Sequence, residues 1–176
     1  DLKTPLTRLK LQLSFMSNKD LSQKMSSNIN EMEKMLNEYL KFTSSNYLEK
    51  NETFNVSELI NTIIVKYNNK NISKEIPAEV YMSGRKNLIE RSLSNLIDNA
   101  LKYAEKINLY LSQKNKNILI IIDDNGPGIP DSKLDEVFRP FYRLDDARTA
   151  NLGGTGLGLA IALDIARGHG GDIKLR

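Results

Sequence analysis

The sequence of 176 residues predicts an α+β fold with two parts. Apolar residues recur every three or four positions over residues 1–45, which is the spacing of helices that pack against one another. Beyond residue 48, helical periods are interspersed with short runs typical of strands. The resulting order of helix, strands, helix, strands, helix and strand predicts the α+β class.

Composition excludes several kinds of chemistry. The chain has no Cys, so it has no disulfides, no thiolate zinc site and no Cys nucleophile, and its single His169 excludes a site with several His ligands. No run approaches the roughly 18–20 apolar residues of a membrane span. The net charge of +3 is small and scattered, which argues against nucleic acid as a partner. We expect a soluble piece of a longer protein.

The first 45 residues predict a helical hairpin with a turn at 17–20. Two apolar series follow the helical spacing: Leu2, Leu6, Leu9, Leu13 and Met16, then Leu21, Met25, Met32, Met35, Tyr39 and Phe42. Leu11, Phe15, Ile29, Leu36 and Leu40 widen the apolar surface beyond one seam. Two helices cannot bury such a surface alone, so a second copy would complete an antiparallel four-helix bundle. The alternative is a hairpin packed on its own downstream domain.

The remaining elements follow in order along the chain. Residues 46–54 lose the helical period and predict a linker. Asn55 with Glu58 forms a capping-box pattern that begins a helix ending near Tyr67. Short strands are expected at 72–76 and 79–82. The next helix is long, with its buried side formed by Leu88, Ile89, Leu93, Leu96, Ile97, Ala100 and Leu101.

The last third of the chain predicts further strands and two helices. A strand at 107–111 and a polar turn at 113–117 precede the apolar run 118–122, which is typical of a central strand. The expected segments after it are a Gly/Pro loop at 123–130, a short helix at 132–137, a helix at 155–167 and the start of a strand at 173–175.

Three groups of residues suit a nucleotide. Asn95, Asn99 and Lys102 share one helix face, where amide oxygens and an ammonium suit hydrated Mg²⁺ and phosphates. Asp124 follows a strand and can accept a hydrogen bond from an exocyclic amine, while the nearby glycines permit close approach to a ring. The glycines of 153–158 precede a helix and favour an anion site. The alternative interpretations are a solvated helix face, a tight turn and a hinge.

The segment between the last two groups begins with the aromatic run 138–142. Its aromatic residues suit the anchors of a lid, and Arg143 or Arg148 suits contact with a phosphate when the lid closes. The alternative is an ordinary surface loop.

In this order the groups resemble the N, G1, F and G2 boxes of sensor histidine kinases, and the opening residues 1–8 resemble the segment after the phosphoacceptor His. The resemblance covers nearly the whole chain and is strongest to osmosensor-type kinases that signal through winged-helix response regulators. It implies a dimerisation and histidine-phosphotransfer hairpin at 1–48, truncated at its start. It also implies a Bergerat-type α/β sandwich at 49–176, the catalytic ATP-binding domain, truncated at its end.

The resemblance also implies residue roles. Catalytic roles fall to Asp1 as the acidic partner of the acceptor His, Thr4 as the residue that orients water for dephosphorylation, and Asn99 as the Mg²⁺ ligand, while Pro5 bends the helix. The ATP contacts implied are Asn95, Asn99, Lys102, Tyr103, Asp124, Gly126, Gly128, Ile129, Arg143, Arg148, Gly154, Thr155, Gly156, Leu157 and Gly158.

The sequence departs from the family pattern at two points. The acceptor His is expected immediately before residue 1, because His169 lies near the other end of the chain and predicts a helix C-terminal cap or a surface residue. Residues 104–106 read Ala-Glu-Lys where the family often has a small residue and Gly or Pro, which puts the shape of that loop in doubt.

The implied function is the cytoplasmic core of an inner-membrane sensor kinase, attached to the membrane through upstream segments. It would bind Mg²⁺ and ATP, form a homodimer through residues 1–45, phosphorylate its own His and pass the phosphoryl to the receiver domain of a response regulator. It would also act as a phosphatase. The alternatives are a signalling scaffold with a degenerate nucleotide site and a gyrase- or chaperone-type ATPase, for which Glu90 or Asp98 would supply a general base.

Overall fold

The computed structural model describes residues 3–15, 18–45, 49–67, 71–144 and 154–176. The chain divides into two units, Asp1–Tyr47 and Leu48–Arg176, and each is described by itself. No helix among the described residues is both long enough and apolar enough to cross a membrane.

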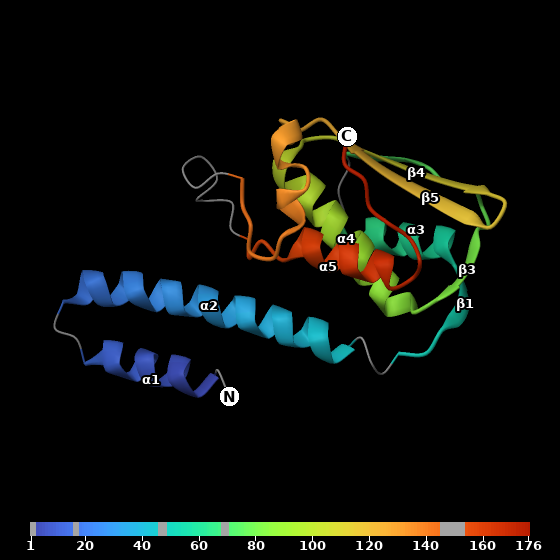
Figure 1. Ribbon diagram of the computed structural model, residues 1–176. Helices are drawn as coiled ribbons and strands as arrows, with labels where there is room; N and C mark the ends of the chain where they lie inside the picture. The colour runs from blue at the N-terminus through green and yellow to red at the C-terminus, as the bar shows by residue number, and fades with distance from the viewer. Residues whose placement is uncertain (1–2, 16–17, 46–48, 68–70, 145–153) are drawn as a thin grey trace. The chain divides into compact units, whose positions relative to one another are not determined.

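The first unit is a helical hairpin formed by α1 (Lys3–Ser14) and α2 (Lys19–Ser45), which lie side by side (Figure 1). Leu13 and Ile29 are buried between them, and the Ser22 hydroxyl donates to the Leu13 carbonyl at 2.8 Å. Asn18 caps α2 by accepting a hydrogen bond from the Leu21 N–H at 3.1 Å. The two helices are therefore as predicted, but the turn is shorter, because α2 already begins at Lys19.

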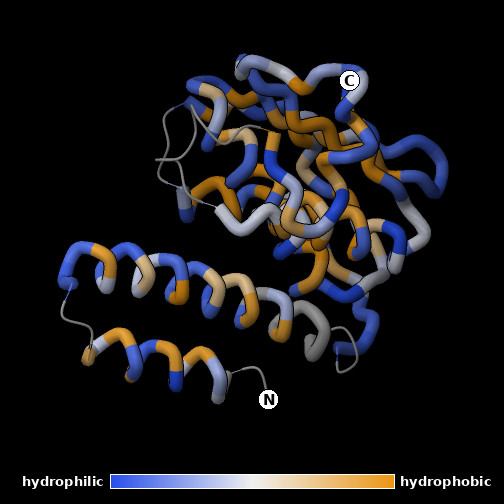
Figure 2. Tube along the Cα trace, turned by 60° about the vertical axis from the view of Figure 1, so that its left-hand side comes forward, coloured by the Kyte–Doolittle hydropathy of each residue, from blue (hydrophilic) through white to orange (hydrophobic). Residues whose placement is uncertain are grey.

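Most apolar side chains of the hairpin remain exposed. Figure 2 shows hydrophobic positions recurring along both helices. The exposed large apolar residues are Leu9, Leu11, Phe15, Leu21, Met25, Met32, Tyr39 and Leu40. Pairing with a second hairpin stays a prediction, but the apolar surface that motivates it is present.

The second unit contains two small sheets. In the first, β1 (Glu52–Asn55) pairs antiparallel with β3 (Tyr81–Gly84). In the second, β4 (Ile107–Lys114) lies between β2 (Ile72–Glu75), which is parallel to it, and β5 (Asn117–Asp124), which is antiparallel.

The linker prediction for 46–54 and the central-strand prediction for 118–122 are wrong. Residues 52–55 form β1 rather than part of a linker, because they find a partner about thirty residues further along the chain. The run 118–122 lies in β5, which is an edge strand of the described sheet, with Leu119 exposed. The central strand is β4, whose side chains Ile107, Leu109 and Leu111 are buried.

Three helices complete the unit: α3 (Val56–Tyr67), α4 (Lys86–Tyr103) and α5 (Gly158–Arg167). They lie on one side of β4 and β5 (Figure 1), and the core between helices and sheet includes Ile60, Ile63, Ile97, Ile107 and Leu109, all at most 1% exposed. Asn55 begins α3 as predicted, since its Oδ1 accepts the N–H groups of Ser57 at 2.9 Å and Glu58 at 3.4 Å.

Other boundaries differ from the sequence prediction. The helix predicted at 132–137 is two 3₁₀ helices, Asp131–Lys133 and Glu136–Phe138. Helix α5 begins three residues late, because Gly156 has a φ of +71°, which no right-handed helix accommodates. Residues 173–175 form no strand in the structure, contrary to the prediction.

His169 follows the end of α5 and ties it to the beginning of α4. Its Nδ1 lies 2.7 Å from the Ile165 carbonyl, and its Nε2 accepts the Arg85 N–H at 3.1 Å. These partners assign the neutral tautomer with the proton on Nδ1. The Arg85 guanidinium donates in turn to the Gly168 carbonyl at 3.2 Å. The predicted role at the C-terminus of a helix is therefore confirmed.

We predict that His169→Ala lowers the free energy of unfolding by about 1–3 kcal/mol, because two hydrogen bonds at a half-buried site are lost. Urea unfolding measures the change. The control is Lys174→Ala, an exposed side chain in the same terminal segment, which should change the value by less than about 0.5 kcal/mol. Equal effects of the two substitutions would contradict the role assigned to His169.

Candidate functional site

The candidate site begins with one polar face of α4. Its opposite side is held in the core by Leu93, Ile97 and Ala100, and this leaves the amides Asn95 and Asn99 and the ammonium of Lys102 half-buried on α4. Tyr103 ends the helix, and the Lys102 Nζ lies 5.0 Å from the centre of its ring.

The glycine-rich loop lies directly against this face. A Cβ on Gly154 would stand 2.8 Å from the Lys102 Nζ, and a Cβ on Gly158 would stand 3.9 Å from the Asn95 Cβ. The structure therefore brings together two groups that are more than fifty residues apart in the sequence. Thr155 and Leu157 alternate with these glycines and are buried, which fixes the loop.

The acidic turn after β5 meets the C-terminal end of the same helix. A Cβ on Gly126 would lie 3.0 Å from the Tyr103 carbonyl oxygen. The Gly126 N–H donates to the Asp124 Oδ1 at 2.8 Å, which orients that exposed carboxylate. Gly128 has a φ of +74° with open space around it, and Ile129 follows half-buried.

Residues 139–143 lie against the glycine loop. The Phe141 N–H donates to the Gly156 carbonyl at 3.0 Å, and a Cβ on Gly156 would stand 2.8–2.9 Å from backbone atoms of Phe141 and Tyr142. Arg143 is half-buried and follows directly. Asp1 and Arg148 lie outside the described residues, whereas Thr4 is exposed in the first turn of α1.

Sequence reasoning missed a polar cluster formed by Lys133, Glu136 and Tyr142. The Glu136 carboxylate accepts hydrogen bonds from the Lys133 ammonium at 2.6 Å and the Tyr142 hydroxyl at 2.8 Å. These bonds, with Lys133 first, hold the pKa of Glu136 below its usual range, and the bond to Glu136 raises the pKa of Lys133. The spacing of Lys133 and Glu136 was a readable signal for an ion pair, but the contact with Tyr142 was not.

Two features of the fold suit the binding of a nucleotide with a metal ion. The Asn95 Nδ2 is buried and has no hydrogen-bond partner among the described residues. Within the part of the chain that the structure describes, no side chain caps the N-terminus of α5, and such an uncapped helix start suits an anion. Amide oxygens, an ammonium and free backbone N–H groups are the donors that Mg²⁺ and phosphates require.

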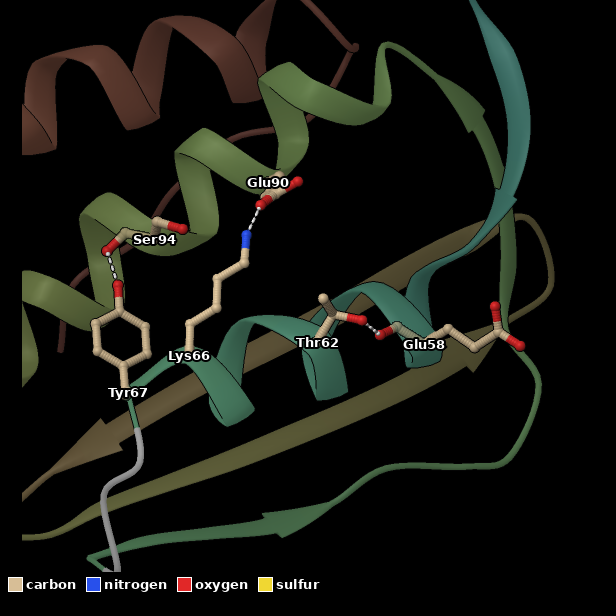
Figure 3. A network of polar contacts seen from close by, with 6 residues as sticks. All are labelled: Glu58, Thr62, Lys66, Tyr67, Glu90 and Ser94. Carbon is tan, nitrogen blue, oxygen red and sulfur yellow. Dashed lines mark hydrogen bonds and ion pairs between the residues drawn. The ribbon is translucent and has the colours of Figure 1, made fainter.

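Of the two carboxylates considered as general bases, Glu90 contacts a side chain of α3 (Figure 3). Glu90 forms an ion pair with Lys66. The hydroxyl of the neighbouring residue Tyr67 donates a hydrogen bond to the Ser94 carbonyl at 3.4 Å. Partial burial is the main cause that raises the pKa of Tyr67, and a hydrogen bond to Asp98 raises it further. The contacts of Lys66 with Glu90 and of Tyr67 with Ser94 therefore contribute to the packing of α3 on α4.

Comparison with known proteins agrees with this geometry. The family described as histidine kinase-, DNA gyrase B- and HSP90-like ATPases matches residues 84–176, and the chain belongs to it, among the sensor histidine kinases of two-component systems. The resemblance predicted from the motifs and the mixed α/β ATPase-like domain are thereby confirmed.

Two curated relatives are similar along the chain. The sensor histidine kinase GtrS of Pseudomonas aeruginosa is 32% identical over 100% of this chain and 37% of its own length. The sensor histidine kinase CpxA of Escherichia coli is 31% identical over 99% of this chain and 41% of its own length. The chain thus spans less than half of these relatives.

A solved structure shares the fold. The mycobacterial sensor histidine kinase MprB superposes with a TM-score of 0.57 at 28% identity, over 68% of this chain and 80% of that chain.

We predict that Gly156→Ala destabilises the fold by about 2–4 kcal/mol, because a side chain at positive φ is strained and its Cβ would meet the backbone of Phe141. Gly170→Ala is the matched control, since Gly170 has a similar φ of +75° and open space around it. Its cost should be about 1 kcal/mol. Thermal unfolding separates the two, and an equal loss would refute the close contact.

Proposed function

We propose that this chain is the ATP-binding catalytic core of a protein-histidine kinase. The observation that carries the proposal is the packing of the loop Gly154–Gly158 on the Asn95 and Lys102 face of α4, with Asp124 at the end of the same helix. Groups suited to phosphates, to Mg²⁺ and to an adenine base thus lie on neighbouring segments around α4.

The adenine end of the site is assigned to the turn after β5. The Asp124 carboxylate is exposed and already oriented by the Gly126 N–H, so it can accept a hydrogen bond from the exocyclic amine of adenine. The open space around Gly128 suits a ring, and Ile129 offers it an apolar neighbour, while Gly126 lets the turn pack against the Tyr103 carbonyl.

The phosphate end is assigned to α4 and the glycine loop. Asn99 would hold Mg²⁺ through its amide oxygen, and Asn95 would support it one turn earlier. Lys102 and Tyr103 would reach phosphates and nucleotide from the end of α4, and the loop would contribute N–H groups. The loop residues concerned are Gly154, Thr155, Gly156, Leu157 and Gly158, and Arg143 and Arg148 are the added cations.

Phosphoryl transfer depends mainly on positioning and on neutralising charge, because the transferred group needs little covalent help. Bound Mg²⁺ supplies charge neutralisation at the phosphates. By the family resemblance the acceptor His would stand immediately before Asp1, whose carboxylate would accept the second ring proton and make the imidazole a better nucleophile. Thr4, exposed one turn later in α1, would orient water for dephosphorylation of the response regulator.

The hairpin is assigned to dimerisation through residues 1–45. Support comes from the exposed apolar side chains on both helices, which a second copy would cover in a four-helix bundle. The partner in signalling is the receiver domain of a response regulator, and the parent protein is placed in the inner membrane with this part in the cytoplasm.

Two alternatives keep the fold and change the activity. A signalling scaffold with a degenerate site would not bind nucleotide, and a gyrase- or chaperone-type enzyme would turn ATP over without phosphorylating itself. Titration with ATP tests the first, and the fate of the labelled γ-phosphate in protein that carries the upstream His tests the second.

We predict that Asp124→Ala weakens ATP binding by about 10–100-fold, because a hydrogen bond to a charged acceptor is lost. Isothermal titration measures the affinity. Asp123→Ala is the matched control, since Asp123 is the adjacent exposed carboxylate and lies 3.9 Å from the Arg176 guanidinium instead. Similar affinities for the two variants would reject Asp124 as the adenine contact.

We further predict that Asn99→Ala removes most of the gain in ATP affinity that Mg²⁺ produces, about tenfold or more, and leaves binding in EDTA unchanged. Asn87→Ala serves as control, because Asn87 is exposed on the first turn of the same helix. Retention of the full magnesium effect in Asn99→Ala would refute the assignment of the metal ligand.

A further inference from the structure

The side chain of Asn125 joins two segments that border the site. Its Oδ1 accepts hydrogen bonds from the Glu105 N–H at 3.0 Å and the Lys106 N–H at 2.8 Å. Its own N–H donates to the Lys106 carbonyl at 3.2 Å. One residue of the turn after β5 thus makes these contacts with two successive residues of the loop after α4.

These bonds explain how an atypical loop keeps its shape. Ala104 ends α4 by donating to the Ala100 carbonyl, and Ile107 begins β4. Between them, Glu105 and Lys106 offer only backbone groups to Asn125, and their side chains are exposed. The loop conformation therefore depends on the acceptor at position 125 rather than on a Gly or Pro within the loop.

Asn125 also stands between the two ends of the proposed nucleotide site. Asp124 directly precedes it, and Gly126 directly follows it and approaches the Tyr103 carbonyl, where a Cβ would lie at 3.0 Å. Tyr103 adjoins Lys102, which lies against Gly154 of the glycine loop. Asn125 thus connects the turn that carries Asp124 to the loop after α4, beside the pairing of Asp124 with Ile107.

We infer that Asn125 is a positioning residue that fixes the distance between the adenine end and the phosphate end of the site, without touching the nucleotide. This inference rests on the proposed function. It gives a specific expectation: loss of the Asn125 bonds weakens binding of a ligand that spans both ends and spares ligands that occupy one end.

Asn125, Glu105 and Lys106 are exposed, so we expect the loss of their hydrogen bonds to change local amide exchange rather than global stability. Hydrogen bonds open to water add little to global stability, since water replaces the lost partner. We therefore expect Asn125→Ala to remain folded and to speed amide exchange at Glu105 and Lys106. Asn125→Asp keeps an acceptor of the same length, so it should retain both bonds.

The experiment measures the binding of ATP, adenosine and tripolyphosphate with Mg²⁺ to three variants. Asn125→Ala should weaken ATP binding by about tenfold and leave adenosine and tripolyphosphate within about twofold. Asn125→Asp should keep ATP within about threefold, and Asn117→Ala, an exposed Asn of β5, should change nothing. If Asn125→Ala is unfolded at the assay temperature, Asn125→Ser replaces it, because its shorter side chain cannot reach both N–H groups.

Three other results would overturn the inference, and they can be told apart. Unchanged ATP affinity in Asn125→Ala overturns the positioning role and leaves the proposed function intact. Equal losses for ATP, adenosine and tripolyphosphate indicate general damage to the site and also overturn it. Failure of the unsubstituted protein to bind ATP overturns the proposed function and this inference together.

Discussion

The close approach of the glycine loop to α4 and to residues 141–142 is the constraint on which the candidate site depends. A β-carbon on Gly156 would meet backbone atoms that cannot yield, and one on Gly154 would displace the Lys102 ammonium. The same missing side chains expose the backbone N–H groups that suit an anion. Packing therefore requires glycine at position 156, the φ of +146° favours glycine at position 154, and the positive φ of Gly156 keeps α5 from beginning earlier.

Helical periodicity predicted the elements whose burial is decided locally. Leu93, Ile97 and Ala100 repeat at helical spacing, and α4 buries them as expected. Strand order in a sheet is not a local property, because β1 pairs with β3 and β2 pairs with β4 across long stretches of sequence. The apolar run in β5 was interpreted as central, but β4 has partners on both sides. The four residues of β1 were too few to stand out from a linker.

The residue types of the site were readable, and their contacts were not. Spacing placed Asn95, Asn99 and Lys102 on one face, because a helix has a fixed geometry. That Lys102 lies against Gly154 depends on how α5 packs on α4, which no spacing records. Asn125 escaped notice for a related reason, since its partners are backbone N–H groups that carry no signature in the sequence.

The contacts of the α4 carboxylates Glu90 and Asp98 bear on whether one of them could activate water for the hydrolysis of ATP. Glu90 is paired with Lys66, and this ion pair helps to attach α3 to α4, whereas the Asp98 side chain is exposed. A hydrolase that activates water would need a carboxylate free to take a proton. A kinase whose nucleophile lies in another unit has no such need, because its ATP-binding domain only positions the phosphates and balances their charge. The ion pair of Glu90 with Lys66 therefore argues against Glu90 as the general base of such a hydrolase.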